Sequence, residues 1–569
     1  MKKLLSLVLC LCMLCSVVPA FAYTSGEYTA TGTGMNGTVE VIVTFDADKI
    51  VDIKFGAHSE TPGLSDPAFE KIPATIIAGQ TLAVDTVSGA TFTSKAILEA
   101  VEAAVVAAGG DPAALKTAAE AEATVAEDEE LTYDVVVIGG GAAGLAAASN
   151  AKDAGASVLL LEKMATNGGN TLISGGVIYA TGTKFQKEAG VEDSVEALVD
   201  YWYTRAEGNA DKAMLTLVAE KSNETIEWLM ENGVELTGPT TSGTSPVPRM
   251  QSTNSGGAGF IVPVTNAVKA KGVDVRYETP AVALIMEDGK CVGVEAVAAD
   301  GHKVIVRAKS VVIATGGFDG DRDMMRKYAP QNVNDYFFAA ASNTGDGIKM
   351  AMAVGADTVF KGGVIGLRGI VNTSFADATN GLVWMPYLMV NEKGERFVNE
   401  ATDYPIVHSG LEKTNHAYLI GDATQLPAAM VEALIPGGYA FVADTLEELA
   451  AKTFMDKDTF LATVARYNEL KGQEDVDFGK PAAAMTGVGE GPYAAVLIRP
   501  ATIGTMGGIK VDLDGHVLDT TGAVIPGLYA AGACANGDFF YQEYPASGTS
   551  IMMCFTVGRI AGTNAAEGK

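Results

Sequence analysis

Residues 133–144 read YDVVVIGGGAAG, and this stretch decides the fold. The unbroken β-branched run over 135–138 is typical of a strand buried on both faces of a parallel sheet. The segment from Ala142 to Gly155, which ends in glycine, is typical of the helix that follows such a strand. Residues 157–162 then supply another apolar strand. This order of strand, tight turn, helix and strand predicts an α/β protein built on a Rossmann-like unit.

The glycines of this stretch have the spacing of a dinucleotide-binding turn. Gly139 would make the turn, Gly141 would let the backbone approach a pyrophosphate, and Gly144 would let helix and strand pack closely. The pyrophosphate would lie at the helix N-terminus, which favours anions. Glu162 ends the following strand 18 positions after Gly144, where an acid can bind ribose hydroxyls. The sequence therefore predicts a bound dinucleotide.

Composition divides the rest of the 569-residue chain into segments. Apolar and polar residues alternate over 23–108 as they do in strands, and a helix-like run near 94–108 follows, so this segment is predicted to be a small α+β module. Residues 109–131 are rich in Ala, Glu, Asp and Thr and are interpreted as a linker or a frayed helix. We expect the nucleotide-binding domain over 132–355 and 501–569, with an inserted α+β capping domain over 356–500.

The first 22 residues have the pattern of an export signal. Lys2 and Lys3 precede an apolar run over 4–18, and Ala20-Phe-Ala22 is a small-residue cleavage site. We expect cleavage after Ala22 and a secreted or extracytoplasmic protein, at the cell surface or in the periplasm. A retained membrane helix is the alternative, although the apolar run is short for a span.

Charge and cysteine content exclude several classes of function. The formal net charge is −29, so nucleic acid and anionic membrane surfaces are poor partners. Only Cys291, Cys534 and Cys554 lie beyond the predicted leader, and they are widely spaced. No spacing typical of haem, iron–sulfur or zinc ligation is present, and no metal site is predicted. Electron transfer would therefore depend on organic cofactors.

Further motifs favour FAD as the nucleotide. The segments NGGNTLISGG at 167–176, ATGGF at 314–318 and IPGLYAAG at 525–532 resemble the flavin-facing segments of fumarate reductase flavoproteins, and the resemblance covers about 132–569. It implies non-covalent FAD, with the N-terminus of a helix at 550 and 551 stabilising negative charge on the flavin ring. The residues implied to bind FAD are Gly139, Gly141, Ala142, Ala143, Gly144, Glu162, Lys163, Asn170, Thr171, Ser174, Gly175, Gly176, Thr315, Gly316, Gly317, Gly532, Ser550 and Ile551.

Two motifs in the small module resemble those of another flavin-binding family. DTVSGAT at 85–91 and HSETPG at 58–63 are similar to the signatures of FMN-binding domains found in sodium-pumping quinone reductase and related exported flavoproteins. The resemblance implies that Thr91 carries FMN through a phosphoester, installed after export by a flavin transferase. The flanking FMN site would include Glu60, Asp85, Ser88, Gly89 and Ala90. The alternative is a Ser/Thr-rich turn before a helix.

The substrate-binding pattern of fumarate reductases is incomplete in this chain. Gly504 stands where the family has a histidine before its T-M-G-G segment, and the stretch 542–548 lacks the family's carboxylate-binding arginine. Tyr404 occupies the place of the proton-donor arginine, four residues after the glutamate of the R-F-x-N-E motif. A site without these cations cannot offset the desolvation of two carboxylates. Fumarate is therefore disfavoured as the substrate.

The motifs present instead resemble those of ketosteroid dehydrogenases of the same fold. R-F-x-N-E-x-x-x-Y is matched by 396–404 and Y-P-x-x-G by 544–548. The resemblance implies that the Tyr544 hydroxyl and the Gly548 amide polarise a carbonyl, and that Tyr404 moves a proton. The alternative is that both tyrosines are hydrogen-bonded packing residues beside the flavin.

Our leading hypothesis is an extracytoplasmic reductase in anaerobic respiration. Electrons from a membrane or extracellular donor would reach FMN on Thr91, pass to FAD and leave as hydride to the C=C bond of an enone or enoate. A second hypothesis is a fumarate- or urocanate-type reductase whose anion site uses Arg249, Arg368 or Arg499. A third is an extracellular flavin electron carrier without its own substrate. The sequence leaves the direction of the reaction open.

Overall fold

The computed structural model describes residues 23–116, 126–370 and 378–569. The predicted leader, 1–22, and residues 117–125 of the predicted linker lie outside the described residues. The chain divides into two compact units, Met1–Thr61 with Ser65–Ala123 and Pro62–Leu64 with Thr124–Lys569. No helix among the described residues is long and apolar enough to cross a membrane.

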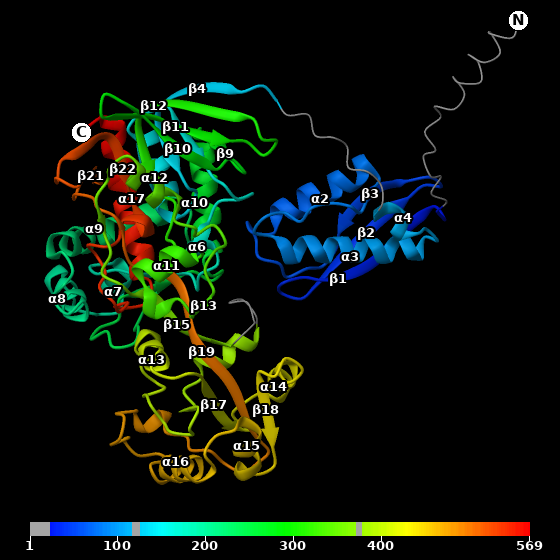
Figure 1. Cartoon of the computed structure of the whole chain (residues 1–569), viewed down its shortest axis with the longest axis vertical. Coiled ribbons are helices and arrows are strands. Elements are labelled where there is room, and N and C mark those ends of the chain that lie inside the picture. The colour runs from blue at the N-terminus through cyan, green and yellow to red at the C-terminus, as the bar shows by residue number, and fades with distance from the viewer. Residues whose placement is uncertain (1–22, 117–125, 371–377) are drawn as a thin grey trace, which may run out of the picture. The chain divides into compact units, whose positions relative to one another are not determined.

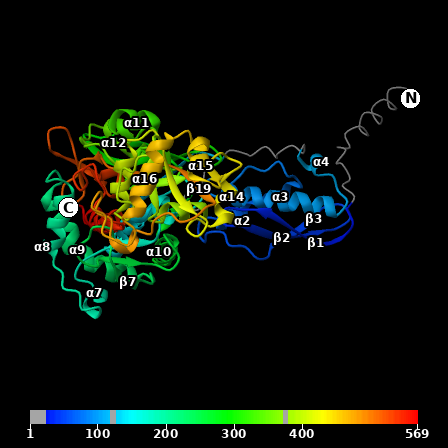
Figure 2. The same cartoon turned by 90° about the horizontal axis from the view of Figure 1, so that it is seen from below.

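The small unit is an antiparallel sheet with helices packed against it (Figure 2). Along β2 the apolar residues Val39, Val41, Val43 and Phe45 are buried in alternation with half-exposed ones, as expected of a strand with one face on a core. The elements are β1 (Gly26–Thr33), β2 (Thr38–Phe45), β3 (Ile50–Phe55), α2 (Asp66–Gly79), α3 (Thr91–Ala107) and α4 (Pro112–Lys116).

The structure forms a regular element at each end of the predicted linker or frayed helix, 109–131. Its first part forms α4, whose Leu115 is fully buried and whose Leu115 carbonyl accepts hydrogen bonds from Leu82 N and Thr81 Oγ1. Its last part belongs to β4 (Glu129–Ile138), because β12 (Lys303–Ile313) pairs with that strand from Glu129 onward. Pairing with a distant strand decides the second boundary, and local composition does not contain that information.

The nucleotide-binding domain is built on an eight-stranded sheet with the order β10-β11-β12-β4-β5-β9, to which β22 and β21 are joined through β12 (Figure 1). The strands β4, β5, β9, β12 and β22 run parallel to their neighbours among themselves. Helix α17 packs on α5, and Gly558 and Gly562 make this possible, because a Cβ at either position would lie within 2.3 Å of the α5 backbone. The predicted βαβ unit is thus present, with α5 opening at the glycine turn.

The remaining bounds of this domain are as follows. They are α5 (Ala142–Asp153), β5 (Val158–Leu161), α6 (Gly169–Leu172), β6 (Val177–Tyr179), α7 (Lys184–Glu188), α8 (Val195–Arg205), α9 (Lys212–Glu231), β7 (Thr237–Thr240), β8 (Met250–Ser252), α10 (Ala258–Ala270), β9 (Asp274–Arg276), β10 (Ala281–Glu287), β11 (Lys290–Val297), α11 (Arg322–Tyr328), η1 (Pro330–Asn332), β13 (Tyr336–Phe337), α12 (Asp346–Ala353), β14 (Thr358–Val359), β20 (Gly508–Ile509), β21 (His516–Leu518), β22 (Val524–Ala530), η4 (Gly532–Ala535) and α17 (Thr549–Glu567).

The capping region carries a second sheet, of six strands, in which β19 is the central strand and pairs with β13, β15, β17 and β18. β19 runs from Tyr493 to Thr505 and so passes through the predicted boundary at residue 500 (Figure 1). The other elements are β15 (Val364–Ile370), η2 (Ala378–Trp384), β16 (Leu388–Asn391), α13 (Tyr404–Leu411), β17 (Ala417–Asp422), α14 (Ala428–Leu434), β18 (Ala440–Ala443), α15 (Leu446–Thr453), α16 (Lys457–Glu469) and η3 (Ala482–Ala484).

Candidate active site

One cavity of about 400 Å³ brings together the predicted nucleotide site and the predicted catalytic residues. Tyr404, Tyr544 and Gly548 line it, although 140 positions separate the first two in the chain. The predicted FAD-binding residues on its wall are Gly139, Gly141, Ala142, Ala143, Glu162, Lys163, Asn170, Thr171, Ser174, Gly175, Thr315, Gly316, Ser550 and Ile551. The cavity therefore has one end suited to a dinucleotide and another suited to a reacting carbonyl.

The glycine turn has the geometry that a pyrophosphate requires. Gly139 has φ +104°, and a Cβ there would lie 2.5 Å from the Ala314 carbonyl oxygen. At Gly141 a Cβ would have only Gly168 O as a neighbour, at 3.9 Å, so the backbone at Gly141 is open to the cavity. A Cβ on Gly144 would lie 1.8 Å from Gly139 O. The absence of a side chain there lets α5 pack closely against the end of β4. The residues present thus fit a dinucleotide at the start of α5.

Four of the predicted FAD contacts do not line the cavity, namely Gly144, Gly176, Gly317 and Gly532. Each of these glycines instead meets protein atoms behind the wall. A Cβ would approach Gly256 C at 2.3 Å from Gly176, Thr505 Oγ1 at 2.4 Å from Gly317, and Ala143 Cβ at 2.7 Å from Gly532. The absence of a side chain at these four positions lets the segments that form the wall pack closely, and their contact with FAD stays a prediction.

Glu162 and Lys163, which follow β5, both form hydrogen bonds within the protein. Glu162 is buried and accepts hydrogen bonds from the amides of Gly140 and Met164, each at 2.7 Å. Burial raises the pKa of Glu162, while these amide bonds oppose the rise. Lys163 donates from Nζ to Asp346 Oδ2 at 2.7 Å and to Thr344 Oγ1 at 2.6 Å. The carboxylate therefore holds the turn in shape at the point where a ribose would lie.

The polar atoms of Asn170 form hydrogen bonds with the protein backbone. Its side-chain amide donates to Ile503 O at 2.7 Å, and its Oδ1 accepts from Ala340 N at 2.6 Å. These bonds join the predicted flavin-facing segment to β19 and to the loop before α12. Asn170 lies on the cavity wall, but its polar atoms position the backbone around the site.

Tyr404 is the first residue of α13, and Asp403 caps that helix by accepting a hydrogen bond from Tyr404 N at 2.9 Å. The ring of Tyr404 lies 6.3 Å from that of Tyr544 and 5.8 Å from that of Trp384, between centroids. Burial, reinforced by the neighbouring Tyr544, raises the pKa of Tyr404 well above 10. The phenol therefore stays protonated at neutral pH.

Tyr544 and Gly548 lie together at the N-terminus of α17. The Tyr544 hydroxyl accepts a hydrogen bond from Ser550 N at 2.8 Å, so its own proton is available to a ligand. Burial raises the pKa of Tyr544, while the amides of Ser550 and Gly548 lower it. Gly548 has φ +88°, and a Cβ there would lie 2.7 Å from the Ile178 backbone. These groups can offer hydrogen bonds to one carbonyl oxygen, an oxyanion-hole arrangement.

None of the arginines considered for an anion site lines the cavity. Arg249 is fully buried and forms a double hydrogen bond with Asp193, at 2.7 and 2.6 Å. Arg368 is buried against Glu400 O, and burial lowers its pKa to about 10, while Arg499 is exposed. In the described part of the chain, Lys163 is the one basic side chain on the cavity wall, and the sequence 371–377 contains no Lys, Arg or His.

The apolar walls of the catalytic end were not predicted. They include Phe338, Ile365, Leu367, Trp384 and Ile503. Three of these side chains, Phe338, Leu367 and Ile503, also pack with Tyr404 in one apolar cluster. Ile365, Leu367 and Ile503 read as ordinary strand core in the sequence, and the pairing of β15 with β19 brings them together. The site is therefore suited to an uncharged, apolar ligand next to the two phenols.

In the small unit, Thr91 is the first residue of α3 and is half-buried. No side chain caps this helix at Ala90, so its N-terminal amides can face a phosphate on Thr91. Asp85, Ser88 and Gly89 are exposed on the preceding turn. Glu60 is buried and accepts hydrogen bonds from Asn36 N, at 2.9 Å, and from Thr93 Oγ1, so it joins the connection between β1 and β2 to α3. The residues present fit a phosphate ester at Thr91.

Comparison with known proteins gives a matching family for each of the two units. Residues 134–551 match the family described as FAD binding domain, and 34–106 match the FMN-binding domain. The chain is 32% identical to "NADH:acrylate oxidoreductase" of Vibrio harveyi, over 96% of this chain and 61% of that protein. It is 30% identical to "Urocanate reductase" of Eggerthella lenta, over 95% of this chain and 92% of that protein.

Among solved structures, the chain is similar to a 3-ketosteroid-Δ4-(5α)-dehydrogenase from Rhodococcus jostii in complex with 4-androstene-3,17-dione. The identity is 29%, the TM-score is 0.64, and the match covers 78% of this chain and 98% of that one. The chain spans about three fifths of the length of the acrylate oxidoreductase. The activity of that whole protein is therefore not assigned to this chain. The chain belongs to the fumarate and urocanate reductase family of FAD-dependent oxidoreductases that act on CH–CH bonds, with an FMN-binding domain at its N-terminus.

Proposed function

We propose that this protein is an extracytoplasmic reductase of the C=C bond of an α,β-unsaturated carbonyl compound, an enone or enoate, in anaerobic respiration. One observation carries the proposal. Tyr404, Tyr544 and Gly548 meet at the end of the FAD cavity, and within residues 23–116, 126–370 and 378–569 no arginine or histidine lines that cavity. A dicarboxylate would lose its hydration there without gaining a cation.

The residues of the site divide the work of carbonyl activation and proton transfer. Reduced FAD bound in the cavity would supply hydride from N5 to the β-carbon of the substrate. Tyr544, through its hydroxyl, and Gly548, through its amide, donate hydrogen bonds to the carbonyl oxygen, where negative charge develops. Tyr404 then gives its phenolic proton to the α-carbon. Because the pKa of Tyr404 is raised, this proton moves only to a strong base such as the enolate formed there.

The electron supply follows from the small unit. FMN linked to Thr91 through a phosphoester would pass electrons to the FAD site, after attachment by a flavin transferase and export directed by residues 1–22. The open turn at 85–91 and the uncapped start of α3 support attachment at Thr91. We propose a membrane-bound or extracellular donor, because no second dinucleotide fingerprint is present in the sequence.

Experiments can distinguish two alternative functions from the proposed one. The relative named urocanate reductase matches nearly the whole chain, which favours a carboxylate substrate as the second candidate. If an arginine away from the cavity wall binds such an acid, replacing Arg249, Arg368 or Arg499 singly will raise its Michaelis constant. A pure electron carrier is disfavoured because the cavity extends beyond the nucleotide end to Tyr404.

The test uses the mature protein with both flavins, reduced anaerobically with a viologen dye. Flavin reoxidation is followed with fumarate, urocanate, cinnamate-type enoates and cyclic enones as acceptors. Rapid reoxidation by enones or aryl enoates supports the proposal. Turnover with NADH but not with the reduced dye would refute the proposed electron route.

A further inference from the structure

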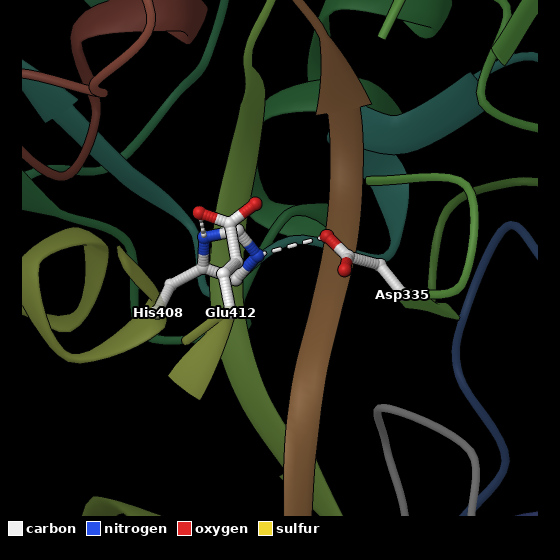
Figure 3. A group of neighbouring side chains, drawn as sticks. All are labelled: Asp335, His408 and Glu412. Atoms are coloured by element: carbon white, nitrogen blue, oxygen red, sulfur yellow. Dashed lines mark hydrogen bonds and ion pairs between the residues drawn. The ribbon is translucent and has the colours of Figure 1, made fainter. Parts of the chain in front are cut away.

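Three potential metal ligands converge where α13 meets the segment before β13 (Figure 3). The imidazole of His408 lies between two carboxylates. Its Nε2 is 2.8 Å from Asp335 Oδ2, and its Nδ1 is 3.8 Å from Glu412 Oε2. One ligand atom from each of the three residues lies within 4.8 Å of the others.

This cluster is short of positive charge and largely shielded from water. The side chains of His408 and Asp335 are 5% and 3% exposed, and that of Glu412 is 24% exposed. A single imidazole can neutralise at most one of the two carboxylates. A bound cation would remove this imbalance.

A fourth side chain points into the same place. Asn332, in η1, is 2% exposed, and its Nδ2 donates to Asp335 Oδ2 at 3.1 Å and to Glu412 Oε1. Its Oδ1 has no hydrogen-bond partner among the described residues. A half-turn of the amide would exchange these two atoms and place Oδ1 between the carboxylates. A cation in that position would make an oxygen favourable there.

We propose that Asp335, His408, Glu412 and Asn332 form a binding site for one divalent transition-metal ion, such as Mn²⁺ or Zn²⁺. A mixed set of imidazole nitrogen, carboxylate and amide oxygen suits these ions. Ligand atoms bound at about 2.0–2.2 Å lie at most about 4.4 Å from one another. The observed limit of 4.8 Å therefore requires only small side-chain movements to close around an ion.

The position of the site gives the ion a structural consequence. Asn332 and Asp335 precede β13. His408 lies in α13 and Glu412 follows that helix, whose first residue is Tyr404. His408 stands one helical turn after Tyr404. An ion would thus fix the helix that carries the proposed proton donor. This consequence rests on the proposed function, whereas the metal site itself does not.

The test measures metal binding by the full mature protein, with both flavins bound and after treatment with a chelator. Calorimetric titration with MnCl₂ and with ZnCl₂ is expected to show one tight equivalent. His408→Gln and Asp335→Asn should each weaken that binding by about tenfold or more. His516→Gln is the matched control, because His516 lies in another group with Asp512 and Asp514. Absence of a stoichiometric site, or loss of it only in His516→Gln, overturns the proposal.

Asn332→Asp gives a second, independent answer. It adds a third carboxylate, so the variant should unfold at a lower temperature without metal and regain stability with Mn²⁺, which it should bind more tightly than the parent. If the cluster is only a protein ion pair, the variant stays destabilised whether Mn²⁺ is present or not. Flavin content confirms folding of each variant. All readouts are metal affinity or melting temperature, so they stand even if the proposed reductase activity fails.

Discussion

Replacing Tyr544 with Phe removes one oxygen from the cavity wall and leaves the ring in place. The lost hydroxyl accepts a hydrogen bond from Ser550 N at 2.8 Å and, in our proposal, donates one to the substrate carbonyl. Removing one donor of an oxyanion hole slows reactions by roughly 10²–10³-fold, or about 2.7–4 kcal/mol. We expect hydride transfer to an enone to slow by that factor.

The same substitution has a separate cost in stability. The half-buried Ser550 amide lies at the start of α17 and would lose its partner. An unsatisfied buried donor costs roughly 1–3 kcal/mol. Denaturant unfolding should therefore show a modest loss of free energy of unfolding, while the cofactor content stays unchanged.

Stopped-flow absorbance measures the effect directly. The protein is reduced with dye, mixed with a cyclic enone without oxygen, and followed by return of the oxidised flavin band. Reduction by dye should proceed at the parent rate, because Tyr544 acts only on the substrate. Tyr541→Phe is the matched control, since Tyr541 is close in sequence but does not line the cavity. If Tyr544→Phe is reoxidised within about threefold of the parent rate, the oxyanion-hole assignment is wrong.

Four further predictions follow from the same contacts. Tyr404→Phe should slow reoxidation by an enone roughly 10²–10⁴-fold with little change in enone affinity, as expected for loss of a general acid; a large loss of affinity measured by titration of the oxidised protein would contradict this. Burial raises the pKa of Asp403 from 3.8 to about 6, so its contribution to stability is present below pH 4 and is lost as the pH rises through about 6. Asp403→Asn keeps a helix-capping side chain, so the change that it causes in the free energy of unfolding should be more favourable at pH 8 than at pH 4, by up to about 3 kcal/mol. Urea unfolding at the two pH values measures this change, and an equal change at both would refute the pKa shift. Gly144→Ala should abolish FAD retention, because its Cβ would lie 1.8 Å from Gly139 O, whereas Gly381→Ala meets no atom within 4 Å and should retain FAD on gel filtration. Thr91→Ala should lose flavin fluorescence on a denaturing gel while Thr91→Ser and the exposed-site variant Thr86→Ala keep it; a fluorescent Thr91→Ala band would place the attachment elsewhere.

The sequence predicts the βαβ unit well because its signal is local. The strand before Gly139 and the helix after Gly141 are specified by neighbouring residues, and the structure forms both. The boundary at residue 500 is missed for the opposite reason. β19 continues to Thr505 because strands from four other segments pair with it. Pairing between strands that are far apart in the sequence cannot be predicted from local residue composition.

The candidate site shows the same division. The motifs at 396–404 and 544–548 pointed to the residues that meet in the cavity, because each motif is contiguous. The apolar wall from β15 and β19 was not predicted, since its residues read as core. The cluster of Asp335 and His408 was also missed: these residues are 73 positions apart, and no spacing rule for metal ligands joins them.

The central claim is that the cavity accepts a conjugated carbonyl and not a dicarboxylate. Its most direct test compares single-turnover reoxidation of the dye-reduced protein by a cyclic enone and by fumarate at equal concentration. We predict rapid reoxidation by the enone and little by fumarate, because only Lys163 brings a positive charge to the described cavity wall. Rapid reoxidation by fumarate, with none by the enone, would contradict the account and return the protein to the dicarboxylate reductases.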